Sequence, residues 1–567
     1  MFMEAGMVGS AKVAPEKRDV GVWIPSGVYN NSGKESQLRT PRPPSIVDSC
    51  LIPFVREHCL TALPFEDDFM RMKAVYKKKI HPIFPAIPLS ALEGSLQESS
   101  NVVLRQLVCL AAAADPDVCL HLRLKNKGSN ILSPQEYSEA LSSSIRATLE
   151  TSLITDRLLH IRILTVLSLY AQPKCADDID LPVQLNGWAI HHLHTLGLHH
   201  AYNAASNSDE METLLCCVWA LDRINAAVHG CPCVMHERDM GADLESCIRK
   251  QPSCFRLLLS VVKWLDRVID LYRPGPSATT ANPKNDIYVD LPDFETMVVD
   301  ADAFGVSVPL LATVEVFYHA VVILSNRKPR TVHIPTTPNQ TTHPTGSARQ
   351  SLAAERIACS VARDHLSPIQ LIPYAASLAL SVEYRVMRQS VTPLSRARAM
   401  YFFKRHCEML QKYRNHFWGA NIVATLAESI IGEVEKAAAT GSTRGATPGP
   451  CNREGTTTEP VQNDTAQNQE IRTLAQQQER RDAELSRDSQ NWPVPDQVIA
   501  GFDAPIASTS RGIMDSTDDL SFLTSGLDDG FFGHIDTLFN LDAVDADTMG
   551  MEAYMPFNWR DWQQYAQ

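Results

Sequence analysis

Residues 212–239, which read ETLLCCVWALDRINAAVHGCPCVMHERD, carry the pattern that most restricts the fold of this chain. Seven positions recur there at helical spacing: Leu214, Cys217, Val218, Leu221, Ile224, Asn225 and Val228. Such spacing aligns side chains on one face of a helix, and an apolar face of this kind is buried in a core. Gly230 and Pro232 follow, and both residue types end helices. We therefore predict a core helix followed by a short irregular acidic segment.

The same helical spacing extends over most of the chain, in residues 46–272, 306–327 and 351–438. Ser133, Pro134 and Glu136 mark a helix start, because serine caps the helix, proline suits its first position and the glutamate completes a capping box. No run of alternating β-branched residues predicts a strand. We therefore predict one all-α domain over residues 44–438.

Proline and polar residues divide this domain. Residues 273–302 and 328–350 are rich in Pro, Thr, Asn and small residues, so we predict mobile surface loops there. Among the last helices we expect breaks near Pro368, Pro373 and Pro393, because proline lacks the backbone N–H that continues a helix.

The two ends of the chain have compositions that predict disorder. Residues 1–43 form a leader with Gly, Ser, Asn and Pro spread through it, and residues 439–514 are rich in Gly, Thr, Pro, Gln and Asn. Chains of this kind cannot bury enough apolar surface to offset the entropy lost on folding. We therefore expect a disordered leader and a disordered linker on either side of the helical domain.

Residues 515–567 differ from that linker, because they hold eleven Asp and Glu residues and one Arg, interleaved with large apolar side chains. The acids repel one another and keep such a chain open, so its apolar groups can dock in a partner's groove. We predict a transcriptional activation segment, with anchors at Phe531, Phe532, Leu538, Phe539, Trp559 and Trp562. A solvated tail, or one that folds back on the helical domain, is the alternative.

The composition restricts partners and location. A net charge of −13 and an isoelectric point near 5.8 argue against a chain that wraps nucleic acid with its whole surface. The 14 cysteines are scattered, and several lie in apolar helical patterns, as free buried thiols do in a reducing compartment. The strongest apolar run, Phe255 to Leu265, is too short to span a bilayer, and residues 1–20 lack a secretory signal pattern. We expect a protein of the cytoplasm or nucleus that does not enter a membrane.

Five sequence blocks follow one another over residues 42–438. The central one has a tryptophan before an Asp-Arg pair and a Gly-x-Pro break, at Trp219, Asp222, Arg223, Gly230 and Pro232. The others are YKKKIHPIFPAIPL at 76–89, LLHIRILTVLSLYAQ at 158–172, WAIHHLHTLGLH at 188–199, with Gly197 and His199, and YHAVVILSNRKPR at 318–330. In this order the blocks resemble the fungal-specific transcription factor middle homology region, the helical domain of zinc-cluster regulators. One residue departs from the pattern: Cys231 stands where the family usually has Arg.

The resemblance implies a nuclear transcription regulator of a fungus. Members of the family read DNA through six closely spaced cysteines that hold two zinc ions, but here Cys50 and Cys59 are followed by none before Cys109. We therefore predict a coregulator without evident DNA contact, which a DNA-bound transcription factor recruits and whose tail meets the transcription machinery. The family further implies a gene cluster of secondary metabolism or nutrient use as its target. Whether the chain forms a homo- or hetero-oligomer stays open.

Two alternatives remain. A zinc cluster lost from this gene through a misplaced start or a skipped exon would make the protein a sequence-specific activator, and an upstream in-frame Cys-x-x-Cys series would reveal it. The second alternative is a helical ligand-binding protein or enzyme with an incidental acidic tail, which a small molecule would stabilise. Activation and repression both fit the residues.

Candidate chemistry is sparse. No nucleotide-binding, nucleophile or kinase motif is present, so we expect neither an enzyme nor a cofactor. Asp222 and Arg223 are most simply an ion pair or helix-to-helix tethers, and the basic run 77–79 is most simply a solvated helix face. We expect a packing role for the histidines crowded at 191–200, which lack the HExxH spacing. The weak candidates for zinc, with buried or idle thiols as the default, are His229, Cys231, Cys233 and His236.

Overall fold

The central stripe forms helix α8 (Ser208–His229), and every side chain from Leu214 to His229 is buried. The structure is a computed structural model, and it describes residues 39–40, 43–175, 178–199, 208–241, 243–270, 291–326, 344–363, 365–390 and 392–443. The predicted leader at 1–43 lies almost wholly outside these residues, as do the tail at 515–567 and nearly all of the linker at 439–514.

The helices before and just after α8 form the first part of the fold. They are α2 (Ser45–Phe54), α3 (Glu66–Val75), α4 (Ser99–Ala112), α5 (Pro134–Leu149), α6 (Arg157–Tyr170), α7 (Leu181–Thr195) and α9 (Leu244–Arg249). Short π-helical turns, Val55–Cys59 and Tyr76–Ile80, continue α2 and α3. Helix α6 packs against α4, α7 and α8, so the apolar faces of these helices share one core.

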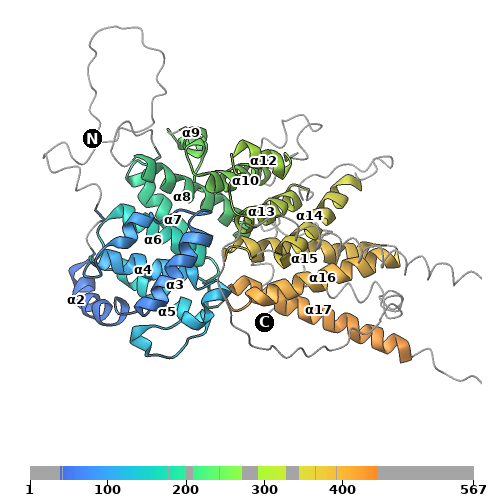
Figure 1. Cartoon of the computed structure of the whole chain (residues 1–567), viewed down its shortest axis with the longest axis horizontal. Coiled ribbons are helices and arrows are strands. Elements are labelled where there is room, and N and C mark those ends of the chain that lie inside the picture. Colours follow the sequence, from blue (N-terminus) through green and yellow to red (C-terminus); the bar gives the residue numbers. More distant parts are fainter. Residues whose placement is uncertain are drawn as a thin grey trace, which may run out of the picture. The chain divides into compact units, whose positions relative to one another are not determined.

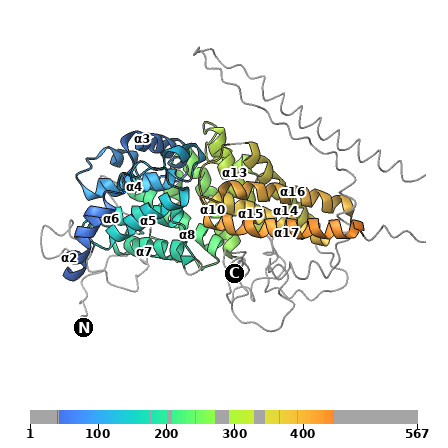
Figure 2. The same ribbon diagram turned by 90° about the horizontal axis from the view of Figure 1, so that it is seen from below.

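The later helices extend that core. They are α10 (Ser253–Asp270), α12 (Phe294–Asp300), α13 (Val308–Ser325), α14 (Pro344–Arg363), α15 (Leu371–Gln389), α16 (Pro393–Tyr413) and α17 (Trp418–Thr443). Helix α10 packs on both α8 and α13, and α13 also packs against α14 and α15. Figures 1 and 2 show α14–α17 as long helices that run side by side. All helices up to Ala438 belong to one unit, and only the last residues of α17 are described beyond it.

The predicted all-α class is confirmed, because the residues that the structure describes contain helices and turns, with one isolated bridge, Arg39 to Asp156, in place of a sheet. The capping box is confirmed as well. The Ser133 side chain accepts a hydrogen bond from the Glu136 N–H, and the Glu136 carboxylate accepts one from the Ser133 N–H. Local sequence signals thus decided where this helix begins.

Three details of the sequence prediction were wrong. The predicted loop at 273–302 contains α12, because Phe294, Met297 and Val298 pack their apolar side chains into the core. The predicted loop at 328–350 ends early, since α14 begins at Pro344. Pro373 does not break a helix but lies in the first turn of α15, where backbone N–H groups have no partner within the helix anyway.

The most apolar helix is α13 rather than the predicted run at 255–265. Among the described residues, α13 is the one helix long and apolar enough, by length and composition, to cross a membrane. However, 67% of this segment is buried in the fold, where it contacts α10, α14 and α15. Its composition is that of a helix surrounded by other helices.

Candidate functional site

Residues of the central sequence block form a buried polar network around Asp222. This side chain is 3% exposed, and its Oδ2 atom accepts hydrogen bonds from the N–H groups of Val234 at 3.1 Å and Met235 at 3.0 Å. Burial raises the pKa of the Asp222 carboxyl, although the Arg223 cation and the two backbone N–H groups act in the opposite direction. Asp222 therefore holds the segment after α8 against the helix that precedes it.

Arg223 connects this network to the next helix. Its Nη1 atom lies 3.1 Å from Asp222 Oδ2, and its Nε atom lies 3.1 Å from Asp266 Oδ1 in α10. The guanidinium also lies 4.9 Å from the centre of the buried Trp219 ring, a cation–π arrangement. The prediction that Asp222 and Arg223 form an ion pair and a helix-to-helix tether is confirmed. The position of Asp266 could not be read from the sequence, because it lies 43 residues further along the chain.

Gly230 ends α8 with a backbone φ of +66°, and its N–H donates to the Ala226 carbonyl at 3.0 Å. Gly197 similarly follows α7 with a φ of +70°. Side chains other than glycine are strained in this left-handed region. Both family-motif glycines therefore have a structural role. Pro232 is exposed in the loop that follows, next to the half-buried Cys231.

Replacing Gly230 with alanine is expected to lower the free energy of unfolding by about 1–2 kcal/mol, the cost of a left-handed conformation for an L residue. The matched control is Gly187→Ala in α7, where a methyl group would meet no atom within 4 Å. That change should instead stabilise the chain by roughly 0.5–1 kcal/mol, because alanine favours helix over glycine. Urea unfolding of the two full-length variants, followed by circular dichroism, measures both values. Equal effects of the same sign would contradict the argument.

The weak zinc candidates do not form one site. His229 and Cys233 are buried, Cys231 is half-buried and His236 is exposed, so the four side chains occupy different environments. Burial raises the pKa of the Cys231 thiol to about 12. In the described parts of the chain, no three His, Cys, Asp or Glu side chains converge as metal ligands.

The histidines in and just after α7 pack against one another and against neighbouring side chains. The ring centres of His160 and His192 are 5.6 Å apart, and those of His194 and His199 are 4.8 Å apart. Burial, together with the neighbouring His160, lowers the pKa of His192 to about 4. His199 is buried, and its carbonyl accepts a hydrogen bond from the N–H of Gly241. These contacts agree with the packing role predicted for this group.

The basic run 77–79 divides into two environments. Lys77 and Lys78 are exposed, as predicted for a solvated face. Lys79 differs from the prediction, because its Nζ atom lies 2.7 Å from Asp115 Oδ2 and 2.8 Å from Asp117 Oδ2. It therefore ties the π-helical turn after α3 to the segment after α4.

A small hollow lies where the early and late helices meet. It has an empty volume of about 270 Å³, which includes open solvent, and its lining includes Gln172, His229, Gln370 and Trp418. The backbone N–H of Trp418 donates a hydrogen bond to Gln172 Oε1 at 3.0 Å, although the two residues are 246 positions apart in the sequence. Only the folded chain brings these residues together. The hollow is small, and the hydrogen bond serves to join α17 to the end of α6.

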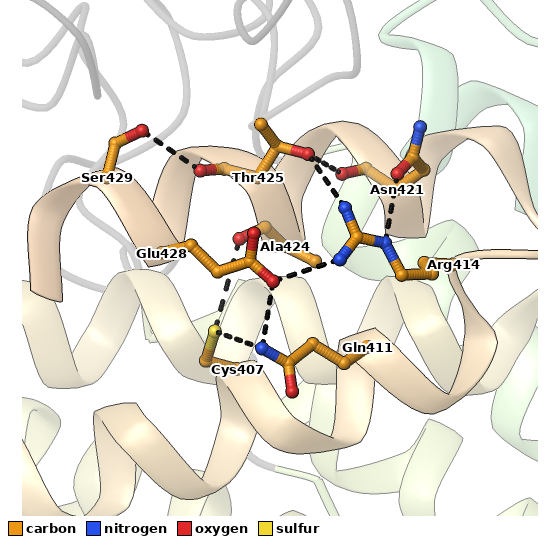
Figure 3. A network of polar contacts seen from close by, with 8 residues as sticks. All are labelled: Cys407, Gln411, Arg414, Asn421, Ala424, Thr425, Glu428 and Ser429. Carbon is orange, nitrogen blue, oxygen red and sulfur yellow. Dashed lines mark hydrogen bonds and ion pairs between the residues drawn. The ribbon is translucent and has the colours of Figure 1, made fainter. Parts of the chain in front are cut away.

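Figure 3 shows how α16 and α17 are held together. Arg414 Nη1 lies 3.0 Å from Glu428 Oε1, and the same oxygen accepts a hydrogen bond from Gln411 at 2.8 Å. Arg414 also donates to Asn421 Oδ1 at 3.2 Å. Further along, Lys404 lies 3.0 Å from Glu435. Arg414 pairs with Glu428, and the earlier residue Lys404 pairs with the later residue Glu435, so the two helices run antiparallel.

Comparisons with known proteins leave the family open. No protein-family model matches the chain, and searches of curated proteins and of solved structures found no match either. The resemblance to the fungal middle homology region therefore stays a prediction from the sequence blocks. The residues of its central block, Trp219, Asp222 and Arg223, serve to hold helices together.

Proposed function

We propose that this chain is a nuclear transcription regulator of a fungus that works as a coregulator. In this proposal, a DNA-bound transcription factor recruits the helical domain, and residues 515–567 contact the transcription machinery. The target would be a gene cluster of secondary metabolism or nutrient use. This target follows from the family resemblance alone.

The observation that carries the proposal is the contrast between the tail and the helical domain. The tail has eleven acids and one Arg among large aromatic and aliphatic residues. In the helical domain, the conspicuous polar residues Asp222 and Arg223 are buried and already paired with other groups of the fold. The composition of the tail, with acids and large apolar residues interleaved, therefore supports protein docking as its activity.

The test joins the full chain to an unrelated DNA-binding domain beside a reporter gene in a fungal host. We expect activation that is lost when residues 515–567 are removed. Replacing Phe531 and Phe532 with alanine should lower activation about ten-fold or more, because each loss of about 1.4 kcal/mol in partner binding is a factor of ten. The matched control replaces Ser521 and Thr524 with alanine and should keep full activity.

Absence of activation from both the full and the shortened chain would overturn the coactivator proposal. Repression in the same assay would indicate a regulator of the opposite sign. Stabilisation of the chain by a small molecule, with no effect of the tail, would favour the ligand-binding alternative.

A further inference from the structure

Large apolar side chains are exposed where α12 meets α13. Val299, Phe304 and Val308 are 55%, 71% and 62% exposed, although apolar side chains of this size are mostly buried. Two exposed acids, Asp300 and Asp302, lie between them in the sequence. Residues 291–308 hold four Asp and Glu residues and no Lys, Arg or His. We call these five residues, which mix apolar side chains with negative charge, the acidic patch.

The backbone at Asp302 departs from what local stability favours. Its φ is +50°, and among the described residues it is the one non-glycine residue with a positive φ. The Asp302 N–H donates to the Val299 carbonyl at 3.0 Å, and the Ala303 N–H donates to the Val298 carbonyl at 2.9 Å. These two bonds end a helix with a left-handed residue, which is usually glycine. Strain of this kind is retained where the side chain has a function beyond the fold.

A second exposed surface has the opposite charge. Residues 344–414, from α14 to α16, contain eleven Lys and Arg residues and four Asp and Glu residues, in a chain whose net charge is −13. On this surface Leu352, Leu394 and Tyr401 are 56%, 66% and 59% exposed. Arg356 is exposed, Arg405 is half-buried, and neither forms an ion pair with a residue that the structure describes. We call these five residues the basic patch.

The two helices that form the basic patch are adjacent. Helices α14 and α16 contact each other, and Arg398 of α16 lies 2.5 Å from Glu355 of α14. Positions 394, 398, 401 and 405 are spaced by four, three and four residues, so they share one side of α16. The basic patch therefore places two cations beside three apolar side chains. This mixture is complementary to the acids and apolar side chains of the acidic patch.

The fold keeps the two patches of one chain apart. Helix α13 begins at Val308, which belongs to the acidic patch. Near the other end of α13, the Ile323 carbonyl accepts a hydrogen bond from Gln350 of α14 at 3.1 Å, two positions before Leu352 of the basic patch. The helix between positions 308 and 323 is roughly 22 Å long. Because these helices pack in one unit, a second copy is needed to bring an acidic patch onto a basic patch.

We propose that the acidic patch of one copy docks on the basic patch of a second copy. The apolar side chains of the two patches pack together, and Asp300 and Asp302 lie near Arg356 and Arg405. Since the two patches are different surfaces, the interface is heterologous, and each pair of copies leaves one patch of either kind open for a further copy. Such an assembly presents several tails to one partner, and only this consequence rests on the proposed function.

Analytical ultracentrifugation of the full-length protein over a concentration series tests the proposal. The unchanged chain should form larger species as its concentration rises, and high salt should weaken the association because exposed charges are screened. Asp300→Arg/Asp302→Asn changes the acidic patch, and Arg356→Glu/Arg405→Glu changes the basic patch. Each double variant should raise the dissociation constant about ten-fold or more, since complementary charges are then replaced by like charges.

A mixture of the two double variants distinguishes a heterologous interface from a two-fold one. One variant keeps an unchanged basic patch and the other keeps an unchanged acidic patch. The mixture should therefore form two-chain complexes at concentrations where each variant alone is monomeric. Docking of identical patches on each other gives no such rescue.

Asp302→Gly separates docking from folding. Glycine adopts a φ of +50° without strain, so this variant should unfold at a higher urea concentration than the unchanged chain. Its association should nevertheless weaken, because the acidic patch loses one of its two charges. Unchanged association of this variant would contradict a role of Asp302 in docking.

The matched control is Lys77→Glu/Lys78→Glu, which reverses two exposed charges outside both patches and should associate like the unchanged chain. Circular dichroism checks that every variant remains folded. The docking proposal would be overturned by an unchanged chain that is monomeric at every concentration, by an equal loss of association in the control, or by a mixture of the double variants that stays monomeric.

Sedimentation is independent of transcription, so this proposal and the proposed function can fail separately. Association through the two patches without reporter activation would support docking and overturn the coregulator role. Reporter activation by a chain that is always monomeric would do the reverse.

Discussion

Replacement of Asp222 with asparagine is expected to lower the free energy of unfolding of the full chain by about 3 kcal/mol, the lower end of the usual cost of breaking a buried ion pair from one side, because Asp266 remains beside Arg223. Arg223 is 1% exposed and would keep its charge in the core. Asparagine also replaces the charged acceptor of the Val234 and Met235 N–H groups with a neutral one, and its NH₂ group is a donor where the carboxylate had an acceptor oxygen. The loop after α8 should therefore loosen together with the contact between α8 and α10.

Urea unfolding followed by circular dichroism and tryptophan fluorescence measures this loss. The control is Glu435→Gln, which breaks the ion pair with Lys404. This pair lies at the surface: the Lys404 side chain is 43% exposed and the Glu435 side chain is 58% exposed. Exposed pairs contribute at most about 1 kcal/mol, so this variant should unfold almost like the unchanged protein. If Asp222→Asn cost no more than the control, the network would not be the tether inferred from its geometry.

The second large effect is a loss of stability as the pH rises, caused by Glu383 in α15. This side chain is 3% exposed, and its Oε1 atom has no hydrogen-bond partner among the described residues. Its pKa is raised to about 8, chiefly by burial; the carboxylate of Glu355 in α14 adds to this effect, and Arg398 of α16 opposes it. The group therefore stays protonated in the folded chain at pH values where it would be ionised in water.

The sign of the effect follows from proton binding. Between a pH near 4.5, where glutamate ionises in the unfolded chain, and a pH near 8, the folded chain keeps a proton that the unfolded chain has lost. The stability that this group contributes is thus complete below a pH near 4.5, and it declines as the pH rises toward 8. The slope is at most about 1.4 kcal/mol per pH unit.

Glu383→Gln should remove this slope, since glutamine has a similar shape and does not ionise. The measurement compares the unfolding free energies of variant and unchanged protein from pH 5 to pH 8. The gain of the variant should increase steadily with pH. Glu408→Gln, at an exposed position on α16, is the matched control. A constant difference between Glu383→Gln and the unchanged protein would contradict the raised pKa.

The sequence was sufficient for features that depend on neighbouring residues. The period of the apolar residues in α8 predicted a buried helix, because side chains three and four positions apart share a helix face. Ser133 and Glu136 predicted their capping box, since its hydrogen bonds join residues of one turn. Gly230 predicted the end of α8, because the left-handed φ that it adopts is set by the local backbone.

Only the tertiary structure decided which distant residues meet. Asp266 as the partner of Arg223, Trp418 beside Gln172, and the burial of Glu383 all depend on how separate helices pack. α12 also escaped prediction, because the core that its apolar residues enter belongs to other parts of the chain. Helical periodicity identifies the face that each helix buries, but the partner of that face is chosen by the packing of all helices at once.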